Sequence, residues 1–71
     1  MKFRQVIEIL NEYNITFLRN GKGSHKIYEG THSGRTWMVV LSYDQLGDDA
    51  PKGTLDSIKR QSGIPKRRFR Q

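Results

Sequence analysis

Two glycine-containing segments divide the middle of the chain into three stretches that favour β-strands. The segments Asn20-Gly21-Lys22-Gly23 and Gly30-Thr31-His32-Ser33-Gly34 consist of turn-forming residues. Asn-Gly favours a hairpin because both positions accept a positive φ. Residues 15–19, 24–29 and 35–42 are rich in β-branched and aromatic side chains. We therefore expect three strands joined by short turns, an antiparallel meander.

A helix is predicted before these strands. Apolar residues recur at i, i+3, i+4 and i+7 between Phe3 and Leu10, which places them on one face of a helix over residues 2–13. Asn14 is expected to end this helix, because asparagine tolerates the left-handed backbone that follows a last helical turn.

A second helix is predicted after them. The polar stretch 43–52 indicates a loop, and Thr54 is expected to be the N-cap of the helix. Gly63 is expected to close the helix and Pro65 to prevent its continuation. Residues 65–71 are then expected to form a basic C-terminal tail.

The expected fold class is α+β, in the order α-β-β-β-α, with a three-stranded antiparallel sheet and two helices on one face. The chain of 71 residues contains no cysteine, so one small domain over residues 1–64 must fold without disulfides. Alternation along the strands predicts that four side chains face the helices and that His25 and Ile27 face the open side. The four are Tyr28, Trp37, Val39 and Leu41.

The positive charge of the chain is concentrated at its C-terminal end. The net charge is +6, and residues 1–58 contain seven cations and all seven acids. The excess therefore lies in residues 59–71, which attract polyanions such as nucleic acid. A solvated basic tail without a partner remains an alternative. Phe69 is the one aromatic residue among these cations and is a candidate for stacking on bases.

His25 is the candidate catalytic residue. It follows the first turn, and Arg19, Lys22, Ser24 and Lys26 surround it in the sequence. A histidine exchanges protons near neutral pH, and RNA supplies its own nucleophile, the 2′-OH, so a ribonuclease needs a base, an acid and a cation. The residues alone leave open that His25 is a surface histidine without a role.

Other sites are not indicated. His32 is expected to be a solvated loop histidine, and the spacing of the two histidines and the aspartates does not suit a metal site. No apolar run approaches the ~18 residues of a membrane span. Arg4, Gln5 and Glu8 interrupt the N-terminal stretch, so we expect that residues 1–10 are not a signal peptide. We expect a soluble, cytoplasmic protein without a membrane partner.

Two motifs resemble the HicA family of toxins. Gly23-Ser24-His25 followed by Tyr28 is similar to the family's G-S-H-x-x-[YF] signature. The run from Gly53 to Ile64, GTLDSIKRQSGI, is similar to the family's second helix. The resemblance covers residues 3–64 and departs from the family after the third strand, where Pro-x-His or Pro-His is absent.

The resemblance implies a bacterial mRNA interferase with a fold like that of double-stranded-RNA-binding domains. It implies RNA cleavage by His25 without a metal or other cofactor, and neutralisation by a HicB-type antitoxin. Arg19, Lys22 and Lys26 are then candidate phosphate contacts, while Gly23 and Ser24 place the histidine. Two alternatives remain: a non-catalytic RNA-binding module that uses the basic C-terminal region, and an interaction protein for an acidic partner.

Overall fold

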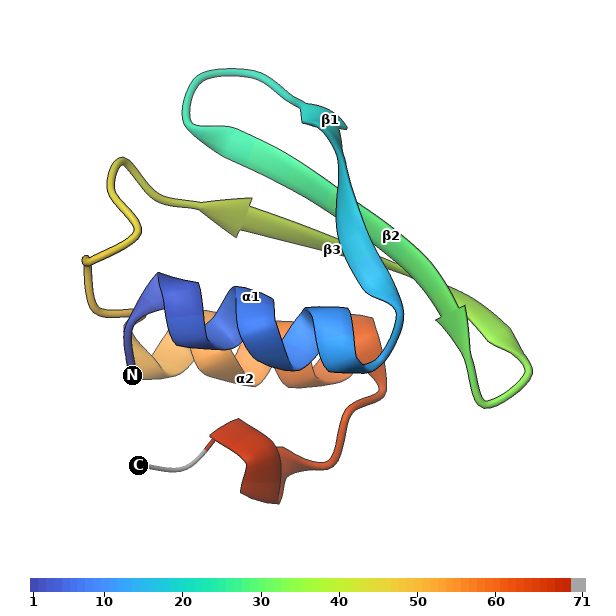
Figure 1. Cartoon of the computed structure of the whole chain (residues 1–71). Helices are drawn as coiled ribbons and strands as arrows, with labels where there is room; N and C mark the ends of the chain where they lie inside the picture. The colour runs from blue at the N-terminus through green and yellow to red at the C-terminus, as the bar shows by residue number, and fades with distance from the viewer. Residues whose placement is uncertain (70–71) are drawn as a thin grey trace.

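The structure is a computed structural model that describes residues 1–69 of the chain. The sheet is antiparallel with strand order β1-β2-β3, and both helices lie on one of its faces (Figure 1). The predicted α+β fold with the order α-β-β-β-α is confirmed. The elements are α1 (Phe3–Glu12), β1 (Ile15–Asn20), β2 (His25–His32), β3 (Arg35–Ser42), α2 (Lys52–Ser62) and the short 3₁₀ helix η1 (Lys66–Phe69).

The core lies between the sheet and the helices. Tyr28 pairs with Val39 across β2 and β3, and these side chains are 4% and 0% exposed. Leu41 is also fully buried, and the half-buried Trp37 packs against the same cluster. The predicted orientation of these four side chains toward the helices is confirmed.

The hairpin between β1 and β2 turns later than the Asn-Gly pair predicted. Asn20 remains the last residue of β1, and the left-handed backbone occurs at Gly23, with φ 58°. The N–H of His25 donates to the C=O of Lys22 at 3.0 Å and closes the turn there. The expectation of a positive φ at Asn20-Gly21 is therefore wrong, because two more residues intervene before the chain reverses.

The hairpin between β2 and β3 is tighter than predicted. Ser33 and Gly34 have φ values of 54° and 76°, the pattern of a two-residue type I′ turn. β2 consequently extends to His32 instead of ending at residue 29. This turn fixes the register of the whole β2–β3 pair.

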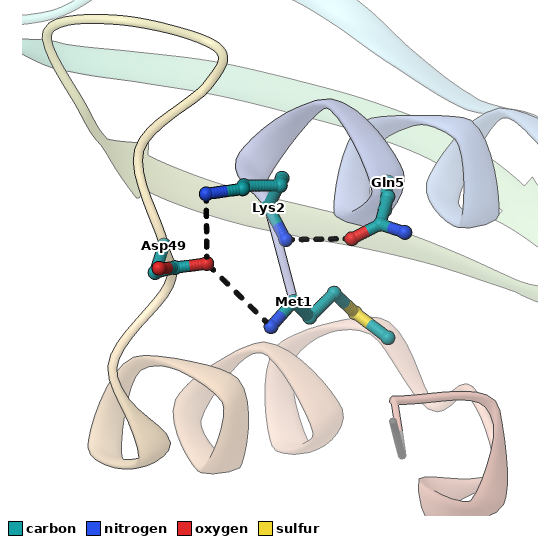
Figure 2. Close-up of polar contacts among 4 residues, drawn as sticks. All are labelled: Met1, Lys2, Gln5 and Asp49. Atoms are coloured by element: carbon teal, nitrogen blue, oxygen red, sulfur yellow. Dashed lines mark hydrogen bonds and ion pairs between the residues drawn. The ribbon is translucent and has the colours of Figure 1, made fainter.

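Polar contacts attach the loop after β3 to the start of α1 (Figure 2). The backbone N–H of Lys2 donates to Gln5 Oε1 at 2.7 Å, and this bond satisfies a donor at the helix N-terminus. Asp49 Oδ1 lies 3.4 Å from Lys2 Nζ and 3.9 Å from the amino group of Met1. Part of the acidic charge of this loop is therefore paired with N-terminal cations.

α2 begins earlier than predicted. Its first residue is Lys52 and its N-cap is Pro51, so the assignment of Thr54 as N-cap is wrong. Proline fixes φ near the value that a helix start needs, and Pro51 has φ −61° with an extended ψ. Gly63 ends the helix in left-handed backbone at φ 66°, as predicted, and a side chain there would overlap the ring of Trp37.

The C-terminal segment folds back onto the domain through η1. Phe69 is 3% exposed and belongs to the core, and Arg68 Nη2 lies 2.7 Å from Glu12 Oε1 of α1. The expectation of a solvated tail is therefore wrong for η1, and Phe69 is not free to stack on bases. Removing an aromatic ring from water stabilises the fold, which explains why Phe69 is buried rather than exposed. Arg70, one of the cations of the predicted tail, lies outside the described residues.

Within residues 1–69, no helix combines the length and the apolar character that a membrane span requires.

Candidate active site at the end of β2

His25 is the first residue of β2, and its side chain is exposed on the open face of the sheet. Tyr28 faces the helices, so by alternation His25 and Ile27 face away from them, as predicted. The backbone of His25 is held in the hairpin, because its N–H donates to the C=O of Lys22 and its C=O accepts from the N–H of Gly21 at 2.9 Å. The imidazole is thus presented to solvent from a fixed backbone.

Gly21 packs closely against the first residues of β2. A Cβ at Gly21 would lie 3.3 Å from Cβ of His25 and 3.5 Å from Cδ1 of Ile27. A side chain at Gly21 would therefore be crowded against His25, and glycine allows the hairpin to close tightly here. The sequence indicated Gly21 only as a turn residue, and its role beside His25 follows from the hairpin geometry.

A pair of serine hydroxyls adjoins His25. Ser42 is its cross-strand partner in β3, and Ser42 Oγ lies 2.8 Å from Ser24 Oγ. Both backbone groups of His25 bond within the β1–β2 hairpin, so His25 and Ser42 form a non-hydrogen-bonded pair. In such pairs the Cα atoms approach to about 4.5 Å and the side chains lie close together. The structure therefore adds Ser42 to the site, next to the predicted Ser24.

Two of the predicted cations lie at this end of the sheet. Arg19 pairs with Ile27 and therefore shares the open face with His25, and Lys22 is exposed in the turn. Within residues 1–69 neither cation forms an ion pair. The segment 13–28 contains no acid, so their positive field at the hairpin has no local neutralising partner in the sequence.

Lys26 is not brought to His25. It faces the helix side, where its Nζ donates to the carbonyls of Ser24 at 3.1 Å and Tyr43 at 2.9 Å and lies 4.4 Å from the Tyr43 ring centroid. Adjacent strand residues point to opposite faces, which separates the two side chains. Beside it, burial and then a hydrogen bond to Tyr43 raise the pKa of Tyr28 well above its usual value, so this hydroxyl stays neutral.

His32 is a structural residue, so the expectation of a solvated loop histidine is wrong. Its Nε2 lies 2.6 Å from the carbonyl oxygen of Ser62 and its Nδ1 lies 3.0 Å from Ser33 Oγ. The imidazole stacks on Trp37 at 5.3 Å between ring centroids and meets the edge of Tyr13. His32 is the last residue of the long β2, before the turn at Ser33-Gly34, and its side chain lies on the helix side. No group of three or more potential metal-ligating side chains occurs in the described part of the chain.

Comparison with known proteins identifies the family. The model of the HicA toxin of bacterial toxin–antitoxin systems matches residues 3–64 of the 71-residue chain. No curated protein and no solved structure matches the chain. The match includes both hairpins, the histidine on the open face and the whole of α2. The chain therefore belongs to the HicA toxin family of bacterial toxin–antitoxin systems.

Proposed function

We propose that this toxin is an endoribonuclease that cleaves mRNA and that His25 is its catalytic residue. The observation that carries the proposal is the exposed imidazole of His25 at the start of β2, on the same face as Arg19 and near Lys22 in an acid-free segment. A phosphodiester is attracted to such a position by the cations. An imidazole there exchanges a proton with the reacting oxygens.

In the proposed reaction the 2′-OH of one nucleotide attacks the adjacent phosphorus, and the P–O bond to the 5′-oxygen of the next nucleotide breaks. His25 either removes the proton from the 2′-OH or gives a proton to the leaving oxygen, and water completes the other transfer. Arg19 and Lys22 stabilise charge on the phosphate oxygens. Because Ser24 Oγ and Ser42 Oγ share one hydrogen bond, one of the two hydroxyls retains a proton that it can donate to the same oxygens.

We further propose that a HicB-type antitoxin neutralises the toxin by covering the open face around His25. A toxin of this family functions with an antitoxin partner. The face also exposes Met38 and Val40, and apolar side chains beside cations suit an acidic protein surface as a partner.

The test is cleavage of a defined mRNA by the purified toxin in buffer containing EDTA. The wild type is expected to shorten the RNA, and His25→Ala is expected to lower the rate at least about 100-fold. Thr31→Ala is the matched control, because Thr31 is also exposed on the open face but lies at the other end of β2. Equal cleavage by wild type and His25→Ala would remove His25 from the mechanism.

The second candidate function is RNA binding without catalysis. It is favoured by the single imidazole at the site, since the cross-strand partner of His25 is a serine and not a second acid or base. In that case the wild-type toxin shifts the mobility of RNA with a steep dependence on salt, and the RNA keeps its length.

A further inference from the structure

The open face beside His25 carries a mixed row of side chains across all three strands. Arg19 of β1 pairs with Ile27 of β2, and Ile27 pairs with Val40 of β3. Val40 is 41% exposed, and Ile27 is half-buried beside it. Cross-strand partners on one face have Cβ atoms about 5 Å apart, so the row is a cation followed by a short aliphatic floor.

This row directly adjoins the row of His25 and Ser42. Residues i and i+2 of a strand are separated by about 7 Å. The position that a Cβ of Gly21 would occupy is within 3.5 Å of both His25 and Ile27. The side chains of His25 and Ile27 therefore lie next to one another on the open face, and a group bound at the imidazole lies within reach of the aliphatic floor.

The next row along the open face contains a negative charge in place of the positive one. Glu29 pairs with Met38 in β3 and with Thr16 in β1. Within residues 1–69 no ion pair neutralises the carboxylate of Glu29. A phosphate is attracted at the row of Arg19 and repelled at the row of Glu29. Ile27 and Val40, which lie beside Arg19 in one row and next to Glu29 in the following row, therefore suit the uncharged part of a nucleotide.

We infer that Ile27 and Val40 form the subsite for one unpaired base next to the cleaved phosphate, with Arg19 at the sugar–phosphate edge. The inference rests on the proposed ribonuclease function of His25. A base reaches the floor only when it is unstacked and unpaired, which is how single strands and loops present their bases to proteins. The site then selects single-stranded RNA, and duplex RNA of the same sequence is a poor substrate.

The test uses a single-stranded oligodeoxynucleotide that contains one ribonucleotide, so that cleavage occurs at one known bond. An abasic residue replaces the base on the 5′ side or on the 3′ side of that bond. The protein variant is Val40→Thr, which keeps the size and the β-branching of the side chain. Met38→Thr is the matched control, because Met38 lies on the same strand and face, is 48% exposed and belongs to the row of Glu29.

Removal of one of the two bases is expected to lower the cleavage rate of the wild type about fivefold, less than loss of stacking on an aromatic ring. Val40→Thr is expected to show a similar loss on the intact substrate and no further loss on the abasic one. Met38→Thr is expected to cleave the intact and the abasic substrates at wild-type rates. If cleavage depends on His25 but its rate is unchanged by either abasic substitution and by Val40→Thr, the inference is wrong and the ribonuclease function is still supported.

The remaining outcomes also decide the matter. Equal losses in Val40→Thr and Met38→Thr overturn the inference, as does a Val40→Thr toxin that cleaves normally but escapes neutralisation, because the row then serves a protein partner. If the wild type leaves every substrate intact, or if His25→Ala cleaves as fast as wild type, the ribonuclease function itself fails. Cleavage of duplex and single-stranded RNA at equal rates removes the requirement for an unpaired base.

Discussion

The two ends of β2 hold the two histidines of the chain in opposite situations. His25 begins the strand, faces the open side and is exposed. His32 ends the strand on the helix side, where both ring nitrogens lie within hydrogen-bond distance of an oxygen and the ring stacks on Trp37. Their positions in the strand differ by seven, an odd number, so alternation alone places them on opposite faces.

The difference shows how burial divides one residue type between two tasks. An imidazole whose donors and acceptors are used by the fold has no free lone pair or proton for a substrate. The ring of His32 connects the end of α2, through the carbonyl of Ser62, to the aromatic side chains of Trp37 and Tyr13. His25 makes no such contribution to the fold, so its presence at an exposed position is better explained by function.

The largest expected effect on stability belongs to His32→Ala. The substitution leaves the carbonyl of the fully buried Ser62 without its partner and removes the stacked ring beside Trp37. We expect a loss of about 2 kcal/mol in the free energy of unfolding and a decrease in Tm of roughly 10 °C. Thermal and urea denaturation measure both quantities.

His25→Ala is the control for that measurement, and its Tm is expected to stay within about 2 °C of wild type because an exposed side chain is removed. If His25→Ala lowered the Tm more than His32→Ala, the proposed difference between the two histidines of β2 would be wrong. Folded His32→Ala protein, assayed at low temperature, is expected to keep the RNA cleavage rate of the wild type, because its ring lies away from the open face.

Much of this fold follows from local patterns in the sequence. The apolar spacing from Phe3 to Leu10 placed α1 correctly, and the left-handed residues Asn14 and Gly63 ended both helices as predicted. Strand alternation assigned Tyr28 to the core and His25 to solvent. These features depend on neighbours a few residues apart, which is why one sequence suffices to predict them.

The errors concern features set by the register and by tertiary packing. The two-residue turn at Ser33-Gly34 makes β2 longer than predicted. As a result, His32 lies in the strand on the helix side of the sheet, and His25 pairs with Ser42. Once the turn is known, pairing the residues of β2 and β3 outward from it predicts that Ser42 lies opposite His25. The sequence alone did not locate the turn, because several glycines offered alternative positions for it. The burial of Phe69 depends on the surface left between the helices, which no local pattern describes.

Lys22 and Lys26 lie close to the start of β2, but they are expected to contribute differently to stability and to RNA binding. Lys26→Met removes an ammonium that bonds two carbonyls, so we expect a loss of about 1 kcal/mol in stability with little change in the cleavage rate per folded molecule. Lys22→Met is expected to leave stability unchanged and to weaken RNA binding several-fold, with a smaller dependence on salt. Denaturation and RNA titration at two or more salt concentrations separate the two effects. Equal effects of both variants on RNA binding would place Lys26 at the substrate after all.

The smallest expected effect on stability belongs to Arg68→Gln in η1, near the C-terminus. Arg68 Nη2 bonds Glu12 at 2.7 Å, and this bond raises the pKa of the guanidinium, but the pair is largely solvated. We expect a small decrease in Tm, below that of His32→Ala, which disappears at high salt because exposed ion pairs are screened. Arg67→Gln is the control, since Arg67 is exposed on η1 and makes no ion pair within residues 1–69. If both substitutions instead weaken RNA binding and leave Tm unchanged, η1 contacts the RNA, and the proposed site around His25 is not sufficient to explain how the toxin binds it.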